Sequence, residues 1–168
     1  MLKPNSGDPG CLKWVQEVNV TGALLSAITR IAHPQQYEAG RQAFAAMQDL
    51  ADVAEVLRWW SSIYSGISVI ANRETPVHRD VGTSPEAYDL LATIGGDEET
   101  TLVLPSMGVF MEYRSGTAVL FSGYAVPHGV TPSVAERVCF AYYIKDNVHE
   151  RFGVKGLDWM NRSLYCTT

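Results

Sequence analysis

The sequence has few cysteines, few charges and no long apolar run, and each of these shortages excludes some classes of protein. Its three cysteines, Cys11, Cys139 and Cys166, lie far apart and form no C-x-x-C pair. An odd, unpaired count is a poor disulfide framework and favours a reducing compartment. No apolar run approaches membrane-spanning length, and the first residues lack the apolar segment of a secretory leader. We therefore expect a nuclear or cytoplasmic protein that is not secreted and uses no membrane.

Charge is also sparse. Charged residues make up 18% of the chain and the net charge is -5. The chain as a whole therefore gives no basic signal for nucleic acid, although an acidic protein can still carry a local basic patch. Hydrophobic residues make up 46%, which predicts a folded globular protein. The length of 168 residues fits one domain with a substantial core.

The first part of the chain, over residues 12–65, has helical character. Residues 1–10 hold two prolines and two glycines, which predicts a loose lead-in. The segment His33-Pro34 interrupts the helical pattern, because a residue before proline avoids the helical region. Further helices are expected over residues 34–50 and 53–60. In the first helix, apolar residues recur at helical spacing at Leu24, Leu25, Ile28 and Ile31.

From Gly66 the composition becomes β-branched and aromatic, with turn signals at regular intervals. Short strands separated by turns suggest a barrel or a sandwich. The expected class is α+β, with a double-stranded β-helix (jelly roll) over residues 66–146. We expect the N-terminal helices to pack on one face of it and residues 147–168 to form a C-terminal tail. The predicted strands cover residues 67–70, 88–94, 100–104, 109–113, 117–122, 125–130 and 137–144.

The triplet His78-Arg79-Asp80 places two metal ligands two residues apart. Alternate side chains of a strand face the same way, so both ligands can point into a barrel. One imidazole and one carboxylate are two of the three ligands of a facial triad, and a histidine from another strand would complete it. Such a triad leaves open positions for a bidentate 2-oxo acid and dioxygen, and it suits non-haem iron(II).

The third ligand must be another histidine. The chain has four histidines, so three remain besides His78. His33 lies in the helical part and His149 lies beyond the last strand, so both are expected to be surface or capping residues. His128 lies late in the β region, within Ala125–Val130. The predicted metal and catalytic group is therefore His78, Asp80 and His128.

Arg137 follows His128 by nine residues and begins the last strand. If residues 131–136 form a tight connection, His128 lies opposite Cys139 across a hairpin, and Arg137 shares the face of Cys139. The arginine would then point into an apolar barrel, where it needs a carboxylate partner. Its planar fork suits the far carboxylate of 2-oxoglutarate. We therefore predict that Arg137 binds this co-substrate.

Each of these signals also has an ordinary explanation. A lone His-x-Asp is usually a hydrogen-bonded surface pair, and Arg137 could be an exposed arginine at a strand end. The three elements in this order, within a β-rich half, favour the iron site. Two other classes stay open. A cupin-type metalloenzyme would keep the histidines and Asp80 without needing Arg137, and a non-catalytic binding module would bind a partner without redox turnover.

From about residue 21 to residue 154 the chain resembles the TET/JBP-like branch of 2-oxoglutarate dioxygenases, especially its compact fungal forms. The resemblance implies the double-stranded β-helix fold, with iron(II) and 2-oxoglutarate as cofactors and dioxygen as co-substrate. It also implies oxidation of a methylated nucleobase, 5-methylcytosine or N6-methyladenine, with DNA favoured over RNA as the partner. The segments that carry it are Asn72–Asp80, Tyr88–Leu91, Gly116–Gly123, Pro127–Val130 and Glu136–Tyr143.

Two further residues are expected to bind the co-substrate. Asn72 lies on the segment that leads to the triplet, where it can hydrogen-bond the co-substrate or the base. Ser122 is expected to assist Arg137 by hydrogen bonding, together with Tyr113.

The substrate is less constrained than the cofactors. Arg73 and Arg79 are candidates for phosphate contacts, with plain surface charge as the alternative. Animal TET enzymes carry a polar, asparagine-containing stretch after the triplet, where this chain has Val81-Gly82-Thr83-Ser84. A small molecule or a protein therefore stays an alternative substrate for a 2-oxoglutarate dioxygenase of this kind.

Overall fold

A computed structural model describes residues 9–161. The chain divides into two compact units, one formed by residues 9–65 with residues 144–161 and the other by Gly66–Tyr143. Within the described residues, no helix has the length and apolar character needed to cross a membrane.

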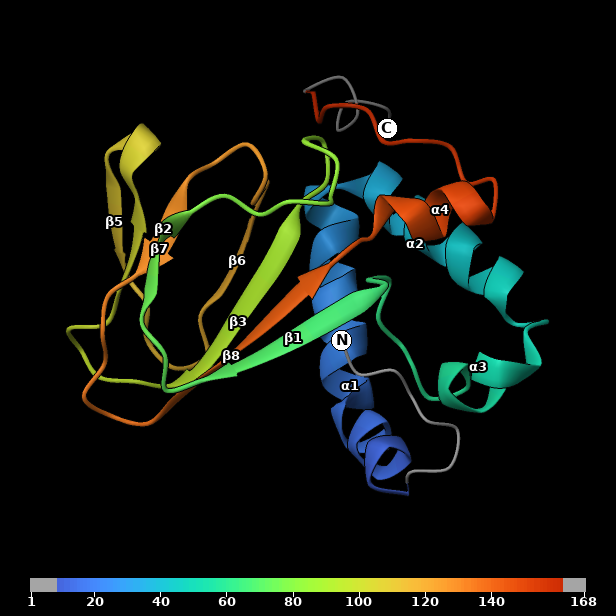
Figure 1. Cartoon of the computed structure of the whole chain (residues 1–168), viewed down its shortest axis with the longest axis horizontal. Coiled ribbons are helices and arrows are strands. Elements are labelled where there is room, and N and C mark those ends of the chain that lie inside the picture. Colours follow the sequence, from blue (N-terminus) through green and yellow to red (C-terminus); the bar gives the residue numbers. More distant parts are fainter. Residues whose placement is uncertain (1–8, 162–168) are drawn as a thin grey trace. The chain divides into compact units, whose positions relative to one another are not determined.

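The helical unit contains helices α1 (Pro9–Ala32), α2 (Pro34–Met47), α3 (Ala51–Leu57) and α4 (Asp146–Arg151) (Figure 1). The predicted break at His33 is confirmed, because its backbone leaves the helical region (φ −148°, ψ 76°). Its ring accepts a hydrogen bond from Gln36 N at 3.3 Å and caps α2. His33 is fully buried, so only its capping role was predicted correctly. The loose lead-in predicted over residues 1–10 is wrong for residues 9 and 10, since α1 begins at Pro9. Residues 1–8 and Cys166 lie outside the described residues.

The buried face of α1 is more polar than its apolar spacing predicts. Leu24 and Ile31 are 60% and 75% exposed, whereas Ser26 and Thr29 are buried. Each of these two hydroxyls donates to a backbone carbonyl one turn earlier, and Thr29 also shares a 2.8 Å hydrogen bond with the hydroxyl of Tyr64. Small hydroxyls that are satisfied in this way can be buried at little cost. The helix was predicted correctly, but its apolar spacing does not mark the buried face, because Leu24 and Ile31 are exposed.

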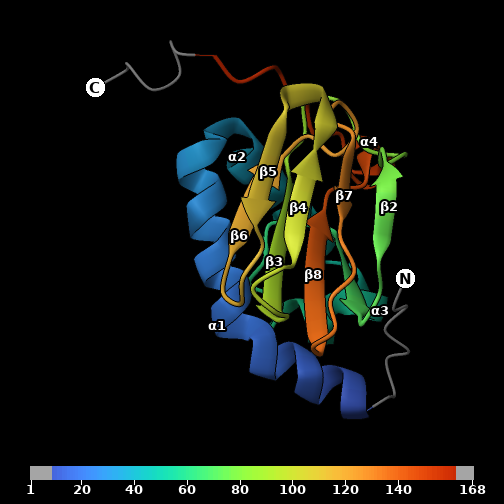
Figure 2. The same cartoon turned by 90° about the vertical axis from the view of Figure 1, so that its left-hand side faces the viewer.

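The β unit holds eight antiparallel strands in two sheets: β1 (Gly66–Ala71), β2 (Thr75–His78), β3 (Asp89–Gly95), β4 (Thr101–Leu104), β5 (Val109–Glu112), β6 (Ala118–Phe121), β7 (His128–Val130) and β8 (Arg137–Tyr143). One sheet has the order β1-β8-β3-β6 (Figure 1) and the other the order β2-β7-β4-β5 (Figure 2). Apart from β4 and β5, consecutive strands always lie in different sheets. This alternation is the jelly-roll form of the double-stranded β-helix, so the predicted α+β class is confirmed.

The connection between β7 and β8 is not a hairpin. β7 pairs with β2 and β4, whereas β8 pairs with β1 and β3. His128 therefore lies opposite His78, and the predicted pairing of His128 with Cys139 is wrong. Residues 131–136 carry the chain from one sheet to the other. Arg137 and Cys139 still share the buried face of β8, as alternation along the strand predicts.

Asp97, in the turn after β3, fixes this crossing segment. Its carboxylate accepts hydrogen bonds from Thr100 Oγ1 at 2.8 Å, Val134 N at 2.8 Å and Ser133 Oγ at 3.0 Å. These bonds, that of Thr100 above all, hold the pKa of Asp97 well below its ordinary value of 3.8. A charged carboxylate thus ties the turn after β3 to the loop that leads into Arg137.

We expect Asp97→Asn to lower the thermal unfolding midpoint by a few degrees at neutral pH and to flatten its dependence on acid. The pKa of Asp97 is lower in the folded than in the unfolded chain, so the charged group stabilises the fold above about pH 4. That contribution is lost as the pH falls toward the folded-state pKa. Thermal scans between pH 7 and pH 3 measure this, with the exposed Glu98→Gln as control. Parallel curves for Asp97→Asn and the wild type would contradict the role given to Asp97.

Candidate functional site

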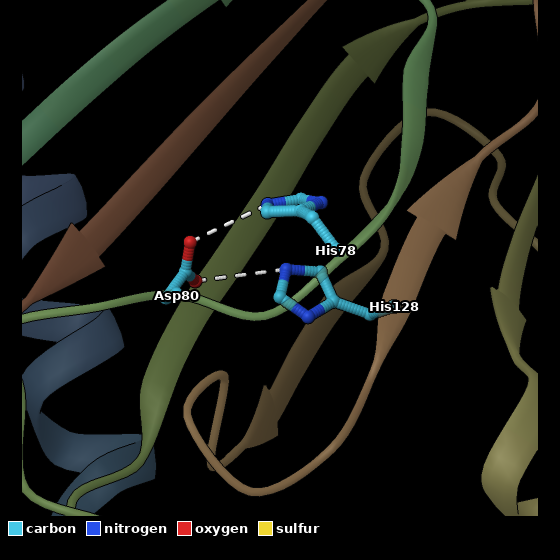
Figure 3. A group of neighbouring side chains, drawn as sticks. All are labelled: His78, Asp80 and His128. Carbon is cyan, nitrogen blue, oxygen red and sulfur yellow. Dashed lines mark ion pairs between the residues drawn. The ribbon is translucent and has the colours of Figure 1, made fainter.

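Two histidines face each other where β2 ends and β7 begins. His78 and His128 are directly opposite in the antiparallel register, and their ring centroids lie 4.4 Å apart. Asp80 joins them: one ligand atom from each of the three residues lies within 4.8 Å of the others. Figure 3 shows both imidazoles and the carboxylate turned toward one another. The fold therefore brings the three predicted ligands together.

Asp80 lies beyond the end of β2, so alternation along a strand does not bring it into the group. Its backbone N–H donates to the carbonyl of Gly123, in the turn after β6, at 3.0 Å. Its carboxylate oxygens lie 3.4 Å from Nε2 of His78 and 3.6 Å from Nε2 of His128. The alternation along a strand from which the sequence argument started therefore does not apply to Asp80. A hydrogen bond between distant segments positions this residue instead.

Both histidines are oriented by the same kind of local contact. Nδ1 of His78 lies 2.9 Å from the carbonyl oxygen of Pro76, and Nδ1 of His128 lies 3.0 Å from that of Val126. A carbonyl oxygen can only accept a hydrogen bond, so each Nδ1 carries a proton, and a neutral ring then presents a bare Nε2 to Asp80. Burial lowers the pKa of His128, which favours the neutral ring.

This arrangement fits a metal ion. Two ring nitrogens and a carboxylate that face one another within 4.8 Å are ligand atoms that a single cation can contact together. Two imidazoles and one carboxylate form the facial set of non-haem iron(II) oxygenases. A carbonyl that holds Nδ1 is the usual outer contact of a metal-bound histidine, because it fixes both tautomer and ring orientation.

Arg137, the first residue of β8, is a buried cation with only 4% of its surface exposed. Its Nε donates to Thr93 Oγ1 at 3.0 Å, and its guanidinium carbon lies 4.9 Å from the centre of the Tyr113 ring. Within residues 9–161 no carboxylate forms an ion pair with it. Burial raises the pKa of Tyr113, so the phenol is neutral and supplies no counter-charge. A buried guanidinium without an anion is costly, and a bound carboxylate would offset that cost.

Asn72 holds the backbone of Arg137. It follows β1 with a left-handed backbone (φ 50°), which asparagine tolerates better than most residues. Its Oδ1 accepts the Arg137 N–H at 2.7 Å, and its own N–H donates to the Arg137 carbonyl at 2.8 Å. This pair of bonds fixes the start of β8. Direct contact between Asn72 and a co-substrate stays a prediction.

We expect Asn72→Gly to weaken 2-oxoglutarate binding about fivefold and to leave iron affinity unchanged. Glycine keeps the left-handed backbone but removes Oδ1, and one lost hydrogen bond contributes about 1 kcal/mol. Anaerobic titration of the iron-loaded protein with 2-oxoglutarate measures the effect, with the nearby exposed Glu74→Gln as control. If Asn72→Gly binds the co-substrate as tightly as the wild type does, the bonds from Asn72 do not position Arg137.

Ser122 lies at the opposite end of β3 from Arg137. Its neighbour Phe121 pairs with the first residue of β3, whereas Arg137 pairs with the last. The Ser122 hydroxyl donates to the carbonyl of Pro85 at 2.7 Å and so fixes the turn after β6. The hypothesis that Ser122 assists Arg137 is therefore wrong. Tyr113 does lie against the arginine, through its ring face. A contact between Ser122 and the co-substrate near the metal stays a prediction.

Strand β3 spans the distance between the metal ligands and the arginine. Asp89, Leu91 and Thr93 are buried and alternate toward one face. Asp89 lies at the Asp80 end, and Thr93 contacts Arg137. From Asp89 to Thr93 the strand extends about 13 Å, and Leu91 between them belongs to the apolar core. A molecule with a metal-binding end, an apolar middle and a far carboxylate matches this order.

Comparison with known proteins agrees with this geometry. Residues 11–146 match the family model Tet_JBP, described as the oxygenase domain of the 2OGFeDO superfamily. A search of curated proteins gave no match. The matched range covers most of the chain and contains the three facing ligands and the buried arginine. The chain therefore belongs to the TET/JBP oxygenase family, and it is a dioxygenase that uses iron(II) and 2-oxoglutarate.

Proposed function

We propose that this dioxygenase oxidises a methylated nucleobase, 5-methylcytosine or N6-methyladenine, in nucleic acid, with DNA favoured over RNA. In this proposal His78, Asp80 and His128 hold iron(II), and Arg137 holds the far carboxylate of 2-oxoglutarate. One observation carries the ligand assignment. Three facing acceptors lie at one end of β3, and a buried arginine without an ion pair in residues 9–161 lies at the other.

When bound, iron(II) with 2-oxoglutarate and dioxygen supplies an oxidant able to hydroxylate a C–H bond, with release of succinate and carbon dioxide. The chain supplies the geometry. The carbonyls of Pro76 and Val126 keep both ring nitrogens aimed at one point, while Thr93 fixes the arginine. Leu102, which is fully buried in the core, helps to exclude water from the interior. Such preorganisation is the protein's own contribution to the rate.

The end of the site that holds the metal ligands is exposed enough for a large substrate to reach it. The side chains of His78 and Asp80 are each 40% exposed, so a substrate can reach this end from solvent. Arg73 and Arg79 lie on the same segment, are exposed and form no ion pair within residues 9–161. Exposed cations beside an open metal site suit the phosphates of a nucleic acid. We infer that these two arginines contact the backbone of the substrate.

The test uses DNA duplexes and single strands that carry 5-methylcytosine, N6-methyladenine or neither. We expect mass spectrometry of the digested nucleosides to show an oxidised or demethylated base from one modified substrate, and no product with Asp80→Ala. RNA with the same modifications is the second substrate set. If neither set reacts while 2-oxoglutarate is still converted to succinate, the substrate proposal fails and the cofactor assignment stands. A small molecule or a protein would then be the substrate class to examine.

A further inference from the structure

Gly123, in the turn after β6, lies beside Asp80. Its carbonyl accepts the Asp80 N–H at 3.0 Å, although the two residues are far apart in sequence. A Cβ atom on Gly123 would lie 2.5 Å from Oδ2 of Asp80 and 2.5 Å from Oδ2 of Asp89. Real Cβ atoms are essentially never found so close to another atom. The two carboxylates therefore occupy the space that a side chain at position 123 would need.

The turn that carries Gly123 is itself held in place. Ser122 Oγ donates to the carbonyl of Pro85 at 2.7 Å, and the N–H of Val126 donates to the Ser122 carbonyl at 2.9 Å. These bonds limit how far the turn can move away from Asp80. The backbone of Gly123 does not lie in the left-handed region, so its conformation does not require glycine. The structure instead gives space as the reason for glycine at this position.

We propose that Gly123 is a positioning residue of the metal centre, because its carbonyl fixes Asp80 and its missing side chain leaves room for the carboxylates of Asp80 and Asp89. The inference rests on the proposed ligand assignment. Oδ2 of Asp80 faces Nε2 of His128 at 3.6 Å, so a displaced carboxylate no longer converges with the histidines. A methyl group at position 123 should therefore weaken metal binding although every ligand remains.

The first test is anaerobic calorimetric titration of the full chain with iron(II). We expect at least tenfold weaker binding by Gly123→Ala than by the wild type. Gly156→Ala is the matched control, because open space surrounds its Cβ position and its backbone is not left-handed either; its affinity should equal that of the wild type. Thermal unfolding of each metal-free protein, measured in parallel, shows whether the variants are folded.

The double variant Gly123→Ala/Asp89→Ala separates crowding from a general folding defect. Truncating Asp89 removes one of the two carboxylates that the methyl group would meet, and the methyl group can then shift into that space and away from Asp80. We therefore expect Gly123→Ala to reduce iron affinity at least threefold less in the Asp89→Ala background than in the wild type. If Gly123→Ala alone does not fold, recovery of folding in the double variant supports the same crowding. Wild-type affinity in Gly123→Ala, or an equal loss in both backgrounds, would overturn the proposal. Unchanged iron affinity in His78→Ala would instead overturn the ligand assignment on which it rests.

Discussion

Asp80→Ala is expected to lower turnover at least a hundredfold while the protein stays folded. Asp80 is the only carboxylate of the three-residue group, so its loss removes both a ligand and the negative charge that balances iron(II). Its side chain is 40% exposed, so truncation leaves no buried cavity. The unfolding midpoint of the metal-free variant should therefore stay within a few degrees of that of the wild type.

Succinate formation and calorimetric iron(II) titration measure the two consequences of Asp80→Ala separately. Asp49→Ala, at an exposed aspartate of the helical unit, is the matched control and should behave as the wild type. His78→Ala should reproduce the loss, because it removes a second ligand from the same group. Full turnover of Asp80→Ala at wild-type iron affinity would mean that a different set of side chains holds the iron.

The positions of the strands in the β unit were more predictable from sequence than the pairing of those strands into sheets. Strand propensity and turn residues located most strands, and the His33-Pro34 break marked the boundary between α1 and α2. The short strand β2 was not among the predicted strands, because it pairs only with distant β7. The segment 131–136 was taken for a hairpin loop. A connection of that length can also cross between sheets, and local sequence does not distinguish the two.

The candidate site, like the strands, could be predicted in part from the sequence. The three ligands and Arg137 could be predicted, because their residue types and their order along the chain can be read directly from the sequence. Thr93 could have been found from its place on β3, two residues from buried Leu91. The role of Gly123 could not, because it depends on Asp80 and Asp89, which only the folded β unit brings beside it. The placement of Ser122 failed for a similar reason, since the register of β3 separates it from Arg137.

Family membership decides between classes that the residues left open. A cupin-type metalloenzyme without 2-oxoglutarate needs only the metal ligands, and a non-catalytic module needs no turnover. The match to the Tet_JBP oxygenase domain over residues 11–146 argues for an enzyme that uses both cofactors. The burial of Arg137 agrees with this class, because a cupin site without 2-oxoglutarate offers no reason for an interior arginine without an acidic partner in the described residues.

Arg137→Met is expected to weaken 2-oxoglutarate binding at least a hundredfold and to leave iron affinity unchanged. Paired hydrogen bonds from a buried guanidinium to a carboxylate contribute about 3 kcal/mol, which corresponds to roughly a hundredfold in affinity. Methionine is long and flexible enough to fill most of the same space. It also removes a buried charge that has no acidic partner in residues 9–161, so the protein without co-substrate should become more stable, by about 1 kcal/mol.

Gain of stability together with loss of binding is the result that separates a co-substrate anchor from a structural arginine, whose removal would lower both. The visible metal-to-ligand band in an anaerobic 2-oxoglutarate titration measures binding, and thermal unfolding measures stability. Arg137→Lys keeps the charge without the planar fork and should bind with intermediate affinity, while exposed Arg41→Met should match the wild type. If the band of Arg137→Met saturates at the wild-type concentration, another side chain holds the far carboxylate. The buried guanidinium would then require a different anion.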